Sequence, residues 1–146
     1  MTLLRRAIAA FGIAVLTAPF APAAADQDPF PIVAIIPITG TAAFNGREQA
    51  KTLVALQDYV NATGGIRGRP IKFEVLDDQS SPQIAVQLVN QAIADHAAAL
   101  MGPGFAAQCG AAMPLVANGP VAYCFSPGVH PPAGSFMFSS SFSTSK

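Results

Sequence analysis

The sequence has few charged residues and no excess of either sign. Only 11% of its 146 residues are charged, and eight basic side chains balance eight acidic ones. Proteins that bind nucleic acid through its phosphates carry clustered Lys and Arg, so no nucleic-acid partner is expected. Since 51% of the residues are apolar, the chain has the composition of a globular, core-forming protein.

The sequence also lacks an apolar segment long enough to span a membrane, which takes about 20 residues. The apolar run at residues 7–16 follows Arg5 and Arg6 and is soon ended by prolines, and alanines at 23–25 precede Asp26. This order is typical of a secretory signal peptide. We therefore expect a signal peptide over residues 1–25, cleavage near Ala25 and a periplasmic protein. The mature chain would carry six basic and eight acidic residues.

Cysteine is scarce. Cys109 and Cys124 have no Cys-x-x-Cys partner and no His at zinc spacing, so no metal site is expected. An exported protein meets an oxidising environment, in which the two cysteines could form a disulfide. Free cysteine also packs well as a small buried hydrophobe. The sequence leaves both alternatives open.

Glycine-rich phosphate loops are absent as well. Five residues separate Gly40 from Gly46, and Arg47 and Glu48 follow, whereas a Walker A loop needs four residues and then Lys-Ser/Thr. The segment does not fit Gly-x-Gly-x-x-Gly either, so no nucleotide or other cofactor is expected.

No set of catalytic residues can be assembled. Asp77 and Asp78 are adjacent at a strand end and should point to opposite sides, so we interpret them as loop-stabilising or capping residues. Ser126 does not lie in the Gly-x-Ser-x-Gly of a nucleophile elbow, and no base pairs with His130. We expect no enzyme; an exported hydrolase using Ser126 or His130 is an alternative.

Strand and helix patterns alternate after residue 30. The apolar run at 32–36 indicates a strand covered on both faces. Ile71, Phe73 and Val75 alternate as in a strand near a sheet edge, and Ser81-Pro82 is a good helix start. We expect strands at 32–36, 71–76, 98–101, 121–125 and 136–138, and helices at 47–62, 82–96 and 106–117. This order predicts an α/β fold, an open parallel sheet with helices on both faces.

Ligands of such sheets bind at the carboxyl ends of the strands. The loops expected there are 37–46, 77–81, 102–106 and 126–134. They offer backbone N–H groups beside helix N-termini, which suits a carboxylate. The sequence therefore predicts a binding protein.

Several segments resemble one family. Residues 37–46 (PITGTAAFNG), 61–68 (NATGGIRG) and 77–82 (DDQSSP) are similar to the leucine/isoleucine/valine-binding proteins of ABC importers, as are Gly102-Pro103 and residues 125–128. The five blocks occur in the family's order, and the resemblance covers essentially all of residues 30–146. It implies a type I periplasmic-binding fold, in which two α/β lobes close on the ligand.

The resemblance also implies a ligand site. The first lobe of the family usually holds the ligand carboxylate with backbone N–H groups and hydroxyls, while an aromatic side chain covers the ligand. The corresponding ligand-binding positions here are Phe44, Asn45, Ala106, Ala107, Ser126, Gly128 and His130. The family usually has hydroxyl residues near 106–107 and 130, so the departures at Ala106, Ala107 and His130 leave an amino acid, another carboxylate and an amide open as ligands.

Family members are about three times as long. We therefore expect residues 26–146 to form a truncated first lobe, whose sheet exposes apolar surface or packs on the missing second lobe or another chain. The function implied is that of an extracytoplasmic substrate-binding component for branched-chain amino acids or related small carboxylates or amides. Its partner would be an ABC permease in the inner membrane. A ligand-sensing module of a receptor and a truncated, non-functional remnant are the alternatives.

Overall fold

The computed structural model describes residues 27–140, so the expected signal peptide at residues 1–25 lies outside the described residues. Strands and helices alternate as the sequence predicts. In chain order they are β1 (Phe30–Ile36), α1 (Ala43–Ala62), β2 (Ile71–Asp77), α2 (Pro82–Ala94), β3 (Ala99–Met101), α3 (Ala106–Ala112), a short 3-10 helix (Met113–Val116), β4 (Val121–Cys124) and β5 (Met137–Ser139).

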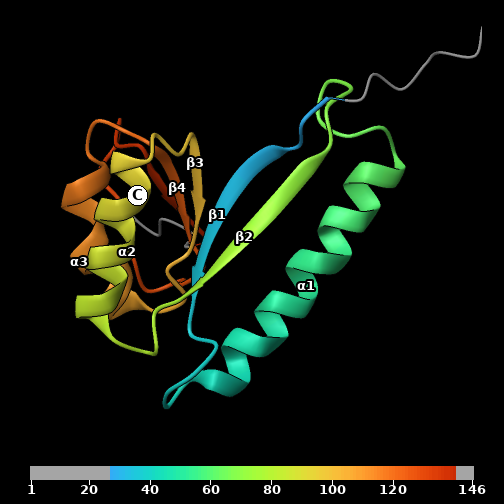
Figure 1. Ribbon diagram of the computed structural model, residues 1–146. Helices are drawn as coiled ribbons and strands as arrows, with labels where there is room; N and C mark the ends of the chain where they lie inside the picture. Colours follow the sequence, from blue (N-terminus) through green and yellow to red (C-terminus); the bar gives the residue numbers. More distant parts are fainter. Residues whose placement is uncertain (1–26, 141–146) are drawn as a thin grey trace, which may run out of the picture.

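The five strands form one sheet in the order β2-β1-β3-β4-β5, and every neighbouring pair is parallel. Helix α1 covers one face of the sheet, while α2 and α3 pack together on the other (Figure 1). The expected open parallel sheet with helices on both faces is confirmed. Strand β2 is an edge strand, also as expected.

Strand β1 separates two apolar cores because alternate residues point to opposite faces. Ala34 and Ile36 pack with Leu53 of α1, and Val33 and Ile35 pack toward α2 and α3. The second core is the larger. It includes Val89 and Ala92 of α2, Leu100 of β3, Cys109 and Ala112 of α3, and Ala122 and Cys124 of β4. All four of these β1 residues are buried, which explains the unbroken apolar run of this strand.

Helix α1 begins at Ala43, four residues before the expected start at residue 47. Phe44 and Asn45 therefore lie in its first turn and not in a loop, which corrects their expected placement. Gly46 does not end a loop here. It packs within the helix against the carbonyl of Pro37, where any Cβ would clash. The sequence pattern alone suggested a turn because glycine is usually a helix breaker.

Other boundaries also differ from the expected ones. The α-helix of α3 ends at Ala112 and continues as the 3-10 helix, because Pro114 has no N–H for an α-helical hydrogen bond. Helix α2 ends at Ala94, and His96 follows with a left-handed φ of 57°.

Val75 was expected to share a covered face with Ile71 and Phe73, but it is 40% exposed. The core around Leu53 includes Phe73 and stops short of Val75.

Candidate functional site

The strand order reverses between β1 and β3, since β2 lies on the other side of β1. In open parallel sheets, ligands bind beside such a switch point at the carboxyl ends of the strands. The loops that follow β1, β2, β3 and β4 meet at this end. They are the candidate site.

The loops after β1 and β2 are fastened together by Thr39, Asp77 and Ser80. The carboxylate of Asp77 accepts hydrogen bonds from the Thr39 hydroxyl at 2.6 Å and the Thr39 N–H at 3.1 Å. The Ser80 hydroxyl donates to the carbonyl of Thr39 and accepts from the N–H of Ala42. Asp77 therefore stabilises the loops, as we expected, and the lateral link to Thr39 is a detail that sequence spacing did not indicate.

Asp77 and Asp78 have opposite pKa shifts. Burial tends to raise the pKa of Asp77, but hydrogen bonds from Thr39 and from the Gln79 N–H together lower it. Burial raises the pKa of Asp78, the hydrogen bond from the Ser80 N–H opposes this effect, and the charge of Asp77 adds to it. The second carboxylate oxygen of Asp78 is buried without a hydrogen-bond partner among the described residues.

The loop after β3 passes very close to β1. Gly102 has a φ of +102°, and a Cβ at this position would clash with the carbonyl of Ile35, so only glycine fits. Its N–H donates to the carbonyl of Tyr123 at 2.7 Å. Helix α3 starts four residues later. Phe105, at its N-cap, gives no side-chain hydrogen bond, and Ala106 and Ala107 are exposed.

The loop after β4 lies beside the start of α3. The Ser126 hydroxyl accepts a hydrogen bond from the N–H of Gly128 at 3.4 Å, and a Cβ at Gly128 would lie 3.9 Å from that of Ala106. The structure thus brings together Ala106, Ser126 and Gly128, with Ala107 next along α3. We call these four residues, which the sequence predicted to hold the carboxylate of a ligand, the carboxylate cluster.

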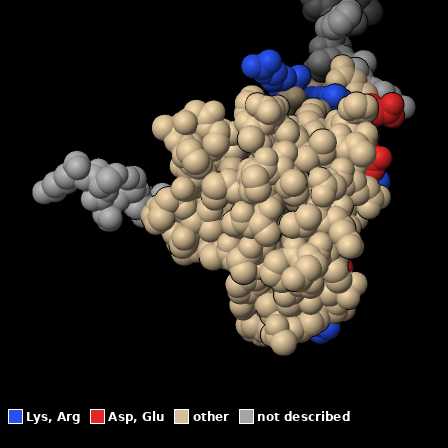
Figure 2. Space-filling view, turned by 90° about the vertical axis from the view of Figure 1, so that its left-hand side faces the viewer, with Lys and Arg blue, Asp and Glu red and all other residues tan. Residues whose placement is uncertain are grey.

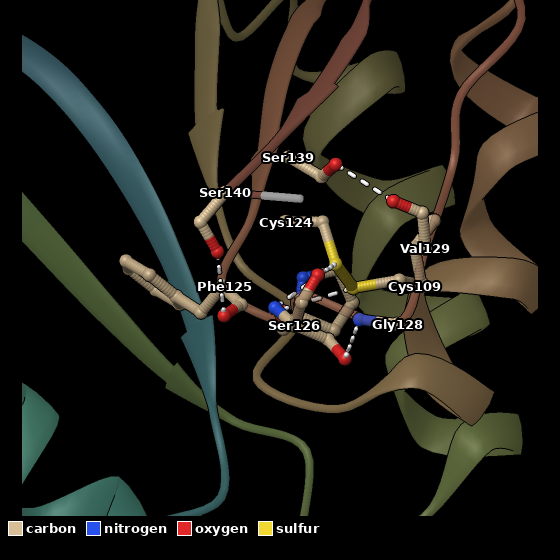
Figure 3. The surroundings of a disulfide bond; sticks show 9 residues. Cys109, Cys124, Phe125, Ser126, Gly128, Val129, Ser139 and Ser140 are labelled. Atoms are coloured by element: carbon tan, nitrogen blue, oxygen red, sulfur yellow. Dashed lines mark hydrogen bonds between the residues drawn. A yellow bond between two sulfur atoms is a disulfide. The ribbon is translucent and has the colours of Figure 1, made fainter. Parts of the chain in front are cut away.

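Cys109 and Cys124 form a disulfide directly behind this cluster, with their Cα atoms 6.0 Å apart (Figure 3). The two cysteines are therefore bonded to each other and are not buried free thiols, which was the other alternative that the sequence left open.

The remaining predicted site residues are Phe44, Asn45 and His130. Phe44 and Asn45 line an open groove of about 410 Å³ with Gln49, Thr52 and Phe125, and Phe125 is the residue before Ser126 of the cluster. Phe44 is 78% exposed. His130 is exposed and follows the buried Val129; neither the groove nor the cluster includes it.

Sequence reasoning missed Gln49. Its side-chain oxygen is buried and has no hydrogen-bond partner among the described residues, and its amide lies beside Gly104 in the loop after β3. The only signal was its place on α1, one turn after Asn45 and one turn before Leu53.

The loops after β3 and β4 carry no formal charge. Residues 97–140 contain no Asp, Glu, Lys or Arg. Figure 2 shows a broad face on which charged side chains lie only along the rim. Apart from His130, groups in these two loops can therefore hold an acid only through hydrogen bonds.

Two features are absent from residues 27–140. None of the helices in this range is long and apolar enough to cross a membrane. The same residues contain no group of three or more His, Cys, Asp and Glu side chains that could hold a metal ion.

Comparison with known proteins gives one family. The model of the periplasmic binding protein family matches residues 29–146. No curated protein matches the sequence.

Solved structures with the same fold include the branched-chain amino acid transporter substrate-binding protein of Streptococcus pneumoniae in complex with isoleucine. It has a TM-score of 0.66 and 22% identity, over 79% of this chain and 34% of that one. A type 1 periplasmic binding protein of Bordetella pertussis has a TM-score of 0.68 and 24% identity, with the same shares covered. An ABC transporter solute-binding protein of R. palustris in complex with benzoate has a TM-score of 0.58 and 25% identity, over 66% of this chain and 27% of that one. The chain thus spans about a third of the length of these structures.

Proposed function

Because the chain belongs to the periplasmic binding protein family, we propose that it supplies the first ligand-binding lobe of an extracytoplasmic substrate-binding component of an ABC importer. The family is one of transporter substrate-binding proteins and not of enzymes. The proposed partner is an ABC permease in the inner membrane. The observation that carries this proposal is the family match over residues 29–146, which includes every loop at the carboxyl end of the sheet.

The proposed ligand is a small carboxylate, either a branched-chain amino acid or an aromatic acid. Structures with this fold hold isoleucine in one case and benzoate in another. In this chain, the N–H groups of Ala106 and Ala107, together with Ser126 and Gly128, would bind the carboxylate. Such uncharged donors suit a single carboxylate group, since several can point at one anion.

The two halves of the site have different proposed roles. Phe44 and Asn45, at the start of α1, would cover the apolar part of the ligand from the groove that they line with Phe125. His130 would reach the ligand only from the rim of the loop after β4, because its side chain is exposed there. A second lobe, closing over this end of the sheet, would complete the cleft.

The hydrolase alternative gains no support from the contacts of Ser126. Its hydroxyl oxygen accepts from the N–H of Gly128, and residues 97–140 contain no acidic side chain to orient a base. A nucleophilic serine needs a base within hydrogen-bond reach and a group that orients that base.

Titration of the isotope-labelled chain with sodium benzoate and with isoleucine, followed by NMR, tests the proposal. We expect saturable shifts of the amide signals of Ala106, Ala107, Ser126 and Gly128. The affinity should be low, since one lobe supplies only part of the contacts of a closed cleft. Shifts confined to other parts of the sheet, or no shifts with either probe, would contradict the proposal.

A matched pair of variants sharpens this test. Ala106→Asp places a carboxylate within the cluster and should abolish the shifts by repelling the ligand acid. Ala117→Asp makes the same change at another exposed alanine, in the segment that leads into β4 at the opposite end of the sheet. It should leave the titration unchanged.

A further inference from the structure

The Cys109–Cys124 disulfide joins helix α3 to the end of β4, the two segments that carry or lead into the carboxylate cluster. Cys109 is the fourth residue of α3, three positions after Ala106, and Cys124 is the last residue of β4, two positions before Ser126. Both cysteines are fully buried. The bridge therefore lies between the helix and the loop that together form the cluster (Figure 3).

One sulfur of the bridge also holds the backbone of the loop after β4. The N–H of Ser126 donates to the sulfur of Cys124 at 3.3 Å. The Ser126 hydroxyl then accepts from the N–H of Gly128 at 3.4 Å. Two successive hydrogen bonds thus link this sulfur to Ser126 and Ser126 to Gly128.

The other sulfur contacts the loop after β3. The Cys109 sulfur lies 3.2 Å from the carbonyl oxygen of Pro103, and this oxygen accepts a hydrogen bond from the N–H of Phe125 at 3.2 Å. A disulfide sulfur carries no proton, so the first of these is a packing contact and not a hydrogen bond. The bridge thus lies beside the point where the loop after β3 and the loop after β4 are hydrogen-bonded to each other.

The loop after β4 also has attachments at both of its ends that do not involve the bridge. The Ser139 hydroxyl donates to the carbonyl of Val129 at 2.7 Å, and the Ser140 hydroxyl donates to that of Phe125 at 3.3 Å. Val129 is itself buried in the larger core. These attachments would survive without the bridge, so the loss of the disulfide should loosen Ser126 and α3 without detaching the whole loop.

We propose that the Cys109–Cys124 disulfide is a positioning element of the ligand site. It fixes the spacing between Ala106–Ala107 and Ser126–Gly128 before the ligand arrives. Preorganised donors bind more tightly because less ordering occurs on binding. Opening the bridge lowers affinity by loosening these two segments while the sheet stays folded. This inference rests on the proposed function, since it assigns a ligand to the same cluster.

Hydrogen exchange measured on the full chain tests the structural part. A phosphine opens the bridge: the S–S bond breaks, each sulfur takes a proton from water, and the phosphine becomes its oxide. We expect faster exchange in segments 103–109 and 124–130 of the reduced chain, and unchanged protection in β1 and β2. Unchanged exchange in the two site segments, or an equal loss of protection in all strands, overturns the proposal.

Two double variants guard against incomplete reduction of this buried bridge. Cys109→Ser with Cys124→Ser, and Cys109→Ala with Cys124→Ala, should both reproduce the exchange pattern of the reduced chain. The phosphine should have no further effect on either. If these variants fold and exchange like the oxidised chain, the bridge does not position the site.

The binding part uses benzoate and isoleucine as probes of the oxidised and reduced chains. We expect reduction to weaken binding by about tenfold, the size of effect that the loss of preorganisation can have. Equal affinities in both states overturn the positioning role. If neither state binds either probe, the proposed function fails, and the exchange pattern alone then supports or overturns the role of the bridge.

Discussion

Two adjacent carboxylates at the end of β2 differ in what surrounds them. Asp77 accepts three hydrogen bonds, two from Thr39 and one from the Gln79 N–H, whereas buried Asp78 accepts one from the Ser80 N–H and keeps an oxygen without a partner among the described residues. A carboxylate stabilised by hydrogen bonds favours its charged form, and a desolvated carboxylate favours its neutral form. The two residues should therefore affect stability with opposite pH dependence.

Proton linkage gives the direction in which each of the two residues changes the stability of the fold with pH. Asp77 has a lowered pKa in the folded chain, so its stabilising contribution is present above the unfolded pKa of 3.8 and is lost as the pH falls through the folded pKa. Asp78 has a raised pKa, so the folded chain binds this proton more tightly than the unfolded chain does. Its contribution to stability increases as the pH falls from its folded pKa toward 3.8.

Isosteric amides test this pair of residues. Asp77→Asn loses an acceptor for the Thr39 hydroxyl and should destabilise the chain by about 1 kcal/mol at pH 7. Asp78→Asn keeps an acceptor for the Ser80 N–H and removes a buried charge, so its stability at pH 7 should equal or exceed that of the wild type. Urea unfolding followed by circular dichroism between about pH 2 and about pH 7 measures both pH dependences. A destabilised Asp78→Asn variant would contradict the assignment.

At the level of elements, the start of α2 is the clearest local signal in the sequence. The Ser81 hydroxyl accepts a hydrogen bond from the N–H of Ile84, and Pro82 follows at the first helical position. Both residue types favour these positions for known reasons: the serine satisfies a free N–H, and the proline has none to satisfy.

Ser81→Ala should therefore cost about 1 kcal/mol of unfolding free energy, since the Ile84 N–H then has no side-chain acceptor. Ser81→Asp is the matched control, because it keeps an acceptor oxygen and adds a charge that favours the helix N-terminus. Its stability should stay close to that of the wild type in the same urea titration. Equal losses in both variants would mean that packing, and not capping, accounts for the effect.

The order of the elements could be predicted from sequence because local signals specify it. The apolar run of β1, the alternation in β2 and the Ser81-Pro82 pair each act over a few residues. The early start of α1 and the burial of Asp78 could not be predicted in this way. Glycine is needed at position 46 of α1 because the carbonyl of Pro37, nine residues earlier, lies where a Cβ would be. Asp78 is buried by tertiary packing.

The candidate site could be predicted only in part, because it too depends on contacts between residues that are distant in the sequence. Strand order places Ala106 near Gly128, and parallel topology makes this proximity foreseeable. The placement of Phe44 and Asn45 in the groove that Phe125 also lines depends on where α1 starts. The pairing of Cys109 with Cys124 depends on their distance in the fold, which sequence spacing does not give.

At the level of the whole molecule, the two faces of the sheet are covered unequally. Helices α2 and α3 cover the face that includes Leu100 and Ala122, whereas α1 lies over only part of the other face. Four large apolar side chains near β4 and β5 are therefore exposed: Val121 at 45%, Tyr123 at 36%, Phe136 at 43% and Phe138 at 55%. This exposure was expected of a sheet that packs on a further lobe or another chain.

A contiguous apolar surface of this kind should bind a dye such as ANS and promote self-association. We expect the chain to enhance ANS fluorescence and to sediment as mixed oligomers, and the double variant Val121→Thr, Phe138→Ser to reduce both effects. Ile66→Ser is the control, because Ile66 is 54% exposed but lies in the turn between α1 and β2, away from this face. A wild-type chain that binds no dye and sediments as a monomer at all concentrations would show that this face is covered in solution. If Ile66→Ser lowered dye binding as much as the double variant does, the dye would be reporting scattered apolar residues and not the open face of β4 and β5.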